Sequence, residues 1–394
     1  MHRSTVSAAL FCTALVVAAA CGGGDHTTGA TSDVIPPSVP ACGATTAVFK
    51  NPPVALSDFV GWEPLGAFNP PGHTFPTDHQ YIYVNNPASQ APRREVNIVA
   101  PADLTITHAR KGTSNPGSIT DYTLDFALCA EVYGEFGHVL TVAPSILNKL
   151  EPFDQFCSTY APAPGATVSV CESKSVAIKI AAGDVIGTAG GPSPHSFGLD
   201  FSLWDARVAP TVFANPARWP AVTSKFDRFH VVPGSDYFAE PARSQIAPRM
   251  GSFDGTIRRT APPVGGTLDV DVPGTAMGVW FTPSQPTFPE YMHLAIAPDH
   301  VNPSRIDISP GISLTNWNRG LVFFTPTSSG LVNRHPAQIT ADGQIYCLET
   351  LGSWAVILQL TDASTLRIEG LLQPATCASA KPWAFTSAAV QYVR

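Results

Sequence analysis

The sequence of 394 residues contains few charged side chains. Asp, Glu, Lys and Arg together make up only 13% of it, about half of the ~25% found in typical soluble domains. The formal net charge is −7, and no cluster of Lys and Arg provides the basic surface needed to bind nucleic acid or an anionic membrane surface. We therefore expect no nucleic-acid partner.

The sequence also lacks long apolar runs. The only run of note covers residues 6–20; it is short and rich in Ala, whereas a membrane-spanning helix needs about 20 apolar residues. The basic groups of His2 and Arg3 precede it, and Ala18-Ala19-Ala20-Cys21 ends it. This order is typical of a secretory signal, so we interpret residues 1–20 as a signal peptide.

The small residues before Cys21 resemble the lipobox of bacterial lipoproteins. The resemblance implies that Cys21 is acylated and becomes the new N-terminus, with the membrane as a partner through its lipid. Residues 21–40, rich in Gly, Thr, Ser and Pro, then form a flexible tether. The alternative is an ordinary signal peptide cleaved near Ala20. Both place the protein outside the cytoplasm, and the lipid predicts anchoring to the bacterial cell envelope, in the periplasm or on the cell surface.

The rest of the chain has the pattern of an all-β protein. It contains 38 Pro and 31 Gly, and short apolar runs alternate with turn signals, as is typical of β-sandwiches and barrels. We expect a mostly β fold with an antiparallel β-sheet domain over residues 41–209. Residues 210–253, aromatic and broken by Pro, form a connector. Residues 254–394 form a second all-β domain, a sandwich or barrel-like unit.

Cysteine usage predicts disulfides rather than a thiolate metal site, because no CxxC spacing occurs. Of the eight Cys, Cys12 leaves with the signal and Cys21 carries the lipid, which leaves an even number in an exported chain. Cys347 and Cys377 are the only two after residue 171, so we expect them to pair. The pairing of the other four stays open: Cys42, Cys129, Cys157 and Cys171.

Four sequence elements of the first domain occur in a recognisable order. They are GHTFPTDH at residues 72–79, VAPADLTI at 99–106, EFGHV at 135–139, and AGDVIGTAGG at 182–191 followed by GLDF at 198–201. In this order they resemble the LytM-like, M23-type metallopeptidase domain, over about residues 60–206. The resemblance implies a zinc site with His73 and Asp78 as the first two ligands, Asp200 as the last, and His138 as a catalytic residue.

The residue types suit this chemistry. Two imidazoles and a carboxylate leave an open position on zinc for water. The metal lowers the pKa of that water and polarises a peptide carbonyl, while a further His moves protons. Each residue also has a purely structural interpretation. His73 is then a solvated loop histidine, Asp78 forms an Asx-turn, His138 is a hydrogen-bonded histidine within a strand, and Asp200 is an outward, solvated Asp.

Two departures from the family pattern decide our interpretation. His73 and Asp78 are five residues apart where the family uses four, and Gly198-Leu199-Asp200 stands where the family has His-x-His. One catalytic His is therefore missing, and although His195 and His79 are close enough in sequence to substitute for it, nothing in the sequence shows that they do. A His/Asp/Asp set is more oxygen-rich than zinc prefers. We expect a degenerate domain that binds or regulates in the cell envelope with weak or no catalysis, with peptidoglycan or an envelope protein as partner.

Two alternatives stay open. One is an active zinc peptidase that cleaves peptide cross-links of peptidoglycan. The other is a structural or interaction lipoprotein whose function resides in the second domain.

Lipid attachment is tested by replacing its acceptor. We expect the Cys21→Ala form to leave the membrane fraction, because the apolar run before it is the only other candidate for an anchor and is cleaved with the signal. A single acyl chain holds a protein only weakly, so stable retention of the parent chain implies more than one chain. Fractionation of cells expressing either form measures this; a Cys21→Ala form that stays with the membrane as the parent does contradicts the assignment.

Overall fold

The computed structural model describes residues 35–394 except 37, 90, 116–118, 162–163, 192–196, 220–226, 318–319, 351–353 and 373. The predicted signal peptide, Cys21 and most of the predicted tether lie outside this part. Antiparallel sheets dominate the described chain, which confirms the predicted mostly β fold. The helices are α1 (Pro144–Leu150) and α2 (Ala242–Ile246), with 3-10 turns η1 (Pro216–Arg218), η2 (Gly234–Tyr237), η3 (Ala247–Arg249), η4 (Glu290–Met292) and η5 (Pro336–Gln338). None of the described helices is long and apolar enough to cross a membrane.

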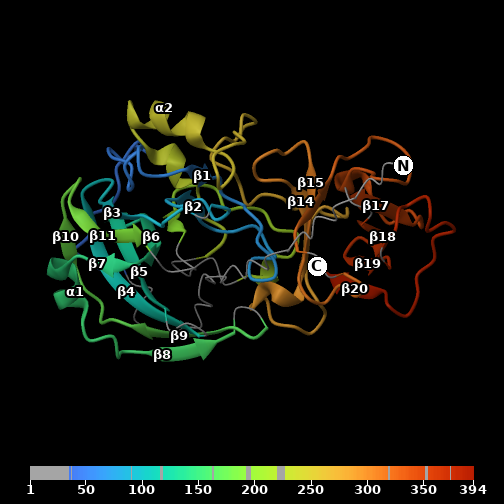
Figure 1. The fold of residues 1–394 in the computed structure, drawn as a ribbon, viewed down its shortest axis with the longest axis horizontal. Helices are drawn as coiled ribbons and strands as arrows, with labels where there is room; N and C mark the ends of the chain where they lie inside the picture. Colours follow the sequence, from blue (N-terminus) through green and yellow to red (C-terminus); the bar gives the residue numbers. More distant parts are fainter. Residues whose placement is uncertain are drawn as a thin grey trace, which may run out of the picture.

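The chain forms two lobes (Figure 1). The first lobe is built on a large antiparallel sheet with strand order β1-β2-β12-β6-β5-β4-β9-β8, and β10 pairs with β4 beside this path. These strands are β1 (Gly61–Glu63), β2 (Gln80–Tyr83), β4 (Leu104–Asn115), β5 (Ile119–Cys129), β6 (Val132–Val139), β8 (Cys157–Tyr160), β9 (Thr167–Glu172), β10 (Ile178–Ile180) and β12 (Gly198–Asp205).

A smaller sheet, with order β3-β11-β7, belongs to the same lobe. It contains β3 (Glu95–Val99), β7 (Thr141–Val142) and β11 (Val185–Gly190). One apolar cluster joins the two sheets, because Ile98 and Ile186 from the small sheet pack with Phe136, Leu199 and Phe201 from the large one. The core therefore lies on one face of the large sheet and leaves its other face for polar side chains.

The second lobe consists of two four-stranded antiparallel sheets. One has the order β13-β14-β15-β16 and the other β17-β18-β19-β20. The strands are β13 (Gly278–Trp280), β14 (Leu294–Pro298), β15 (Ile306–Pro310), β16 (Val322–Phe324), β17 (Tyr346–Thr350), β18 (Trp354–Asp362), β19 (Thr365–Gly370) and β20 (Val390–Val393). Trp280, Ile296 and Ile308 share a core with Val356 and Ile368, so the sheets pack as a sandwich, and the described strands do not close into a barrel.

The predicted connector, residues 210–253, contributes to the cores. Phe238 and Ile246 pack into the core of the first lobe. Phe213 and Phe229 join a mixed cluster with Phe75 of the first lobe and apolar residues of β13 and β14. The two lobes thus share buried apolar surface, which favours a fixed arrangement over a loose tether.

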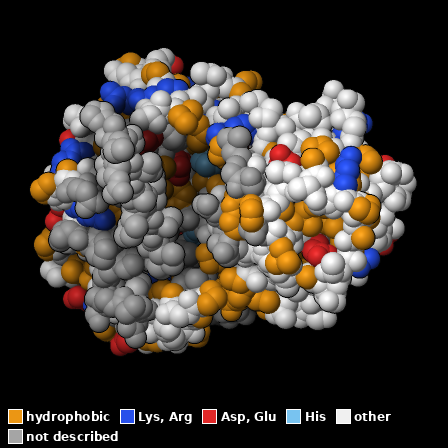
Figure 2. Space-filling model, turned by 45° about the vertical axis from the view of Figure 1, so that its right-hand side comes forward, with side chains coloured by type: hydrophobic (Ala, Val, Ile, Leu, Met, Phe, Trp, Pro, Cys, Tyr) orange, Lys and Arg blue, Asp and Glu red, His pale blue; other side chains and the backbone are white. Residues whose placement is uncertain are grey.

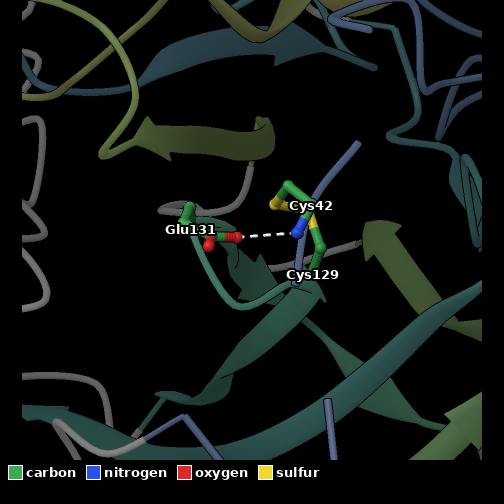
Figure 3. Close-up of side chains that lie close together, drawn as sticks. All are labelled: Cys42, Cys129 and Glu131. Carbon is green, nitrogen blue, oxygen red and sulfur yellow. Dashed lines mark hydrogen bonds between the residues drawn. A yellow bond between two sulfur atoms is a disulfide. The ribbon is translucent and has the colours of Figure 1, made fainter. Parts of the chain in front are cut away.

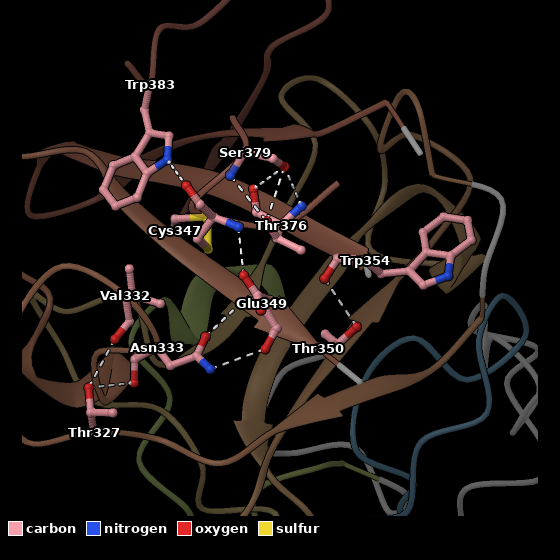
Figure 4. The surroundings of a disulfide bond; sticks show 11 residues. Thr327, Val332, Asn333, Cys347, Glu349, Thr350, Trp354, Thr376, Ser379 and Trp383 are labelled. Carbon is pink, nitrogen blue, oxygen red and sulfur yellow. Dashed lines mark hydrogen bonds between the residues drawn. A yellow bond between two sulfur atoms is a disulfide. The ribbon is translucent and has the colours of Figure 1, made fainter. Parts of the chain in front are cut away.

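Three disulfides hold the described chain together. The predicted Cys347–Cys377 pair is present at an S–S distance of 2.01 Å, and the other two are Cys42–Cys129 and Cys157–Cys171. Bonds of this kind persist in oxidising compartments, which fits a protein outside the cytoplasm. Figure 4 shows the polar frame of the second-lobe disulfide: Glu349 Oε2 accepts a 2.6 Å hydrogen bond from the Cys377 amide, and Trp383 Nε1 donates to the Cys377 carbonyl at 2.8 Å.

Removal of this disulfide tests how strongly it holds the second lobe. Changing Cys347 and Cys377 together to Ala opens a link across 30 residues, and the chain-entropy model predicts a loss of roughly 3–4 kcal/mol in the free energy of unfolding. Urea unfolding followed by tryptophan fluorescence measures it. The matched control is the double Ala variant of Cys157 and Cys171, a shorter link of 14 residues, which should lose less. Stability within about 0.5 kcal/mol of the parent contradicts the prediction.

Candidate functional site

Strand order gathers the candidate residues of the first lobe. β12 lies between β2 and β6, so Asp200 is paired in register with Tyr81 on one side and with Gly137 on the other. His79 immediately precedes β2, and His138 follows Gly137 in β6. Two histidines far apart in the sequence therefore flank one carboxylate.

Side-chain alternation directs Asp200 to the polar face of the sheet. Its neighbours Leu199 and Phe201 are fully buried in the apolar core, and successive strand residues point to opposite faces. Asp200 is only 8% exposed, so the alternative of an outward, solvated Asp is wrong. Gly137 makes room for it, because a Cβ at position 137 would lie 3.0 Å from the Asp200 Cβ.

A β-bulge aims His138 at Asp200. The pairing of β5 with β6 shifts register between Tyr122 and Leu124, and His138 has a positive φ of 59°, which is uncommon for a residue other than Gly. Bulges of this kind redirect side chains next to functional sites. The His138 Nδ1 lies 2.7 Å from Asp121 Oδ2, and its Nε2 lies 3.6 Å from Asp200 Oδ2.

His79 approaches the same oxygen from the other side. Its Nδ1 lies 3.0 Å from Asp78 Oδ1, and its Nε2 lies 3.8 Å from Asp200 Oδ2. That Nε2 is buried and has no hydrogen-bond partner among the described residues. Each imidazole is thus held at Nδ1 by its own carboxylate while its Nε2 faces the shared Asp200. Outer carboxylates orient metal-ligating histidines in this way.

Charge balance at the site depends on both carboxylates and an arginine. Burial lowers the pKa of His79, but Asp200 and Asp78 outweigh it and hold that pKa above the ordinary 6.5. Burial would raise the pKa of Asp78, yet Arg228 and His79 hold it well below its usual range. Asp78 is therefore a carboxylate engaged by Arg228, whose Nη1 lies 3.6 Å from its Oδ2.

A chain of contacts through His79 and Asp200 links the four predicted residues. The His73 ring lies against the His79 ring, with centroids 5.2 Å apart, and Asp78 meets Asp200 only through His79. Sequence reasoning gave the ligand position to Asp78 and treated His79 as a substitute with no support. The sequence offered only the adjacency of Asp78 and His79, and packing decides which of the two side chains faces β12.

The described residues contain two groups whose ligand atoms all lie within 4.8 Å of one another, so clusters able to hold a metal exist. They are Cys42 with Cys129 and Glu131, and Asp299 with His300 and Asp307. The trio of His79, His138 and Asp200 is not among them. Its donor types suit zinc, and binding there requires the two imidazoles to move towards each other.

The first of these groups is not a metal site. Figure 3 shows Cys42 and Cys129 joined through sulfur, so neither offers a thiolate, and Glu131 Oε2 already accepts a 2.7 Å hydrogen bond from the Cys42 amide.

A buried ionic network continues along the same polar face. Arg110 in β4 contacts Asp125 Oδ1 at 3.0 Å and pairs with Glu135 of β6. His108 lies between Asp125, at 3.3 Å, and Glu172, at 3.4 Å. Burial opposes the charge of His108, but the hydrogen bonds to both carboxylates raise its pKa to about 9. Sequence analysis missed this network, because its members are scattered over four strands.

A histidine at position 198, as the resembled His-x-His pattern would have it, does not fit without a movement of the sheet. A Cβ at this position would lie 2.2 Å from the carbonyl oxygen of Ile82 in β2. The departure from the His-x-His pattern is therefore built into the backbone. His195, a possible substitute, lies outside the described residues.

One face of the molecule is hollowed, and acidic and histidine side chains are visible inside the hollow beside apolar ones (Figure 2).

Comparisons with family models, curated proteins and solved structures found no significant match. The site must therefore be interpreted from its own geometry.

Arg110 provides a test of the buried network. Changing Arg110 to Ala leaves Glu135 buried without its counter-charge and Asp125 with His108 alone, so we expect the free energy of unfolding to fall by about 3–5 kcal/mol. Urea denaturation at neutral pH measures this. The control is Lys111→Ala, one residue along the same strand, which should change stability by no more than about 0.5 kcal/mol. A loss below about 1 kcal/mol for Arg110→Ala would mean that solvent already screens the network.

Proposed function

We propose that the protein is a lipid-anchored component of the bacterial cell envelope. Its first lobe is a degenerate LytM-like domain that binds a divalent metal, with zinc as the favoured ion, and serves as a binding or regulatory module. The observation that carries this proposal is the convergence of His79 Nε2 and His138 Nε2 on Asp200 Oδ2, at 3.8 and 3.6 Å. Zinc bonds of about 2.0–2.2 Å separate the ligand atoms of a tetrahedral site by roughly 3.3–3.6 Å.

The contacts made by the Nδ1 atom of each histidine support the metal proposal. Asp78 and Asp121 each contact the Nδ1 of one imidazole, so the Nε2 atom of each ring is the one that lies near Asp200. Bound metal would supply Lewis acidity and an activated water. The chain's own residues orient the imidazoles and hold a concentration of negative charge that favours a cation.

A count of donors argues against efficient catalysis. A metal hydrolase needs three ligands and a separate base. If His79, His138 and Asp200 all bind metal, His138 is a ligand and can no longer act as the base. Asp78 is a weak proton acceptor, because Arg228 and His79 hold its pKa well below its usual range. We therefore infer that hydrolysis is weak or absent.

The second candidate function is an active peptidase that cuts peptidoglycan cross-links. It is favoured by one observation, the contact of the His73 ring with the His79 ring. With His73, His79 and Asp200 as ligands, His138 would act as the base that Asp121 orients.

The tether limits the choice of partner. If Cys21 carries the lipid, the length of residues 21–40 limits the distance between the fold and the membrane to at most roughly 70 Å. A fold held this close to the membrane meets envelope polymers and envelope proteins, so peptidoglycan is the first partner to test.

Metal analysis of the purified full chain tests the proposal. After chelator treatment and zinc titration, His79→Ala and Asp200→Ala should each bind about one zinc ion fewer per chain than the parent, because each lacks a ligand. Zinc affinity should rise between pH 6 and pH 8, since the raised pKa of His79 makes metal compete with a proton at lower pH.

His230→Ala is the matched control, because His230 belongs to the same lobe but pairs with Asp227. It should bind as much zinc as the parent. Equal zinc binding by the parent, His79→Ala and Asp200→Ala contradicts the metal proposal. Incubation with isolated peptidoglycan separates the two functions: retention without clearing favours the binding module, whereas clearing that a chelator and His138→Ala both abolish establishes the peptidase.

A further inference from the structure

The second lobe contains a cluster that the proposed function does not use. Asp299 and His300 follow β14, and Asp307 lies in β15, the partner strand of the same hairpin. One ligand atom from each residue lies within 4.8 Å of the others. Asp307 points away from the sandwich core, because its neighbours Ile306 and Ile308 fill that core.

Asp307 is the unusual member of this cluster. It is 1% exposed, and neither of its carboxylate oxygens has a hydrogen-bond partner in the described chain. Burial of an unpaired carboxylate costs several kcal/mol. A buried carboxyl group without a hydrogen-bond partner needs either a proton or a cation close to it.

His300 is oriented as metal-ligating histidines are. Its Nε2 lies 3.4 Å from Glu63 Oε1 in β1 of the first lobe, and its Nδ1 is buried with no hydrogen bond to any described residue. An outer carboxylate on one ring nitrogen leaves the other nitrogen free for a metal. The arrangement also joins the hairpin of the second lobe to the first.

The surrounding charges do not neutralise the cluster fully. Arg305 Nη2 lies 2.5 Å from Asp299 Oδ2, and Asp299 Oδ1 accepts from the amides of Val301 and Asn302. Arg259 donates to the carbonyl of His300 and to that of Pro263. Neither arginine hydrogen-bonds Asp307, so its charge remains without a direct partner.

We propose that Asp299, His300 and Asp307 form a structural site for a divalent first-row transition-metal ion, with zinc as the representative ion. An imidazole with two carboxylates suits such metals, whereas calcium takes six to eight oxygen ligands. The site is buried between the lobes and positions the β14–β15 hairpin against β1 through Glu63. It is separate from the trio around Asp200, and its function is stability.

The experiment counts zinc in a background that lacks the first site. The full chain carrying His79→Ala and His138→Ala is treated with chelator, dialysed against zinc and analysed for metal and for thermal unfolding. We expect it to retain about one zinc ion per chain and to unfold at a temperature several degrees higher with zinc than without. Calcium should give no such shift.

Asp307→Asn in the same background should abolish both the bound zinc and the zinc-dependent shift. It removes a ligand charge while keeping the side-chain size, so the metal-free protein should be as stable as the background or more so. If Asp307→Asn fails to fold, His300→Gln in the same background provides a second test, and we expect it to lose the bound zinc as well.

Asp271→Asn is the matched control. Asp271 is a partly buried carboxylate of the second lobe that accepts hydrogen bonds from the Ala214 and Val279 amides, so its loss should leave the zinc shift intact. The proposal is overturned if the background variant binds no zinc, or if Asp307→Asn and His300→Gln keep the same zinc shift. Loss of zinc from the Asp200 trio alone leaves this result unaffected.

Discussion

The pairing of β12 between β2 and β6 is the constraint on which the candidate site depends. It fixes Asp200 opposite Tyr81 and Gly137, which brings one histidine to each side of the carboxylate. A slip of one residue would turn Asp200 into the apolar core and expose Leu199 and Phe201. The buried core therefore enforces the register, and the register in turn assembles the polar site.

The polar face of this sheet contains more buried charge than a stable fold requires. Arg110 satisfies two carboxylates, and Arg228 links Asp78 of the first lobe with Glu290 of the second, whose Oε1 lies 3.3 Å away. Burial raises the pKa of Glu290 to about 7 against the opposing charge of Arg228. Retaining such groups is costly in free energy, and the clustering of perturbed groups around His79 is typical of a functional site rather than of a merely structural sheet.

Much of the architecture could be predicted from the sequence, because it depends on local patterns. Turn spacing predicted the β fold, cysteine positions predicted the Cys347–Cys377 pair, and alternation placed Asp200 opposite in face to Leu199. The role of His79 could not be predicted, because adjacent residues leave a loop in directions that only packing decides. Arg228, within the predicted connector, makes that decision by engaging Asp78.

The cluster of Asp299, His300 and Asp307 was beyond sequence analysis for a different reason. Its histidine has no ligand spacing, and Asp307 in a strand has the same pattern as any solvated strand Asp. Its importance depends on the other lobe, which buries that face and supplies Glu63 to His300. The burial of this cluster depends on the contact between the two lobes, so no single sequence segment predicts it.

The central claim is that His79, His138 and Asp200 share one metal ion. Anomalous scattering at the zinc edge, from crystals of the full chain grown with zinc, tests it most directly. The account predicts a peak about 2.0–2.2 Å from both Nε2 atoms and from an Asp200 oxygen, with the two imidazoles closer together than in the metal-free protein. Well-ordered density for these three side chains with no anomalous peak among them would contradict the account.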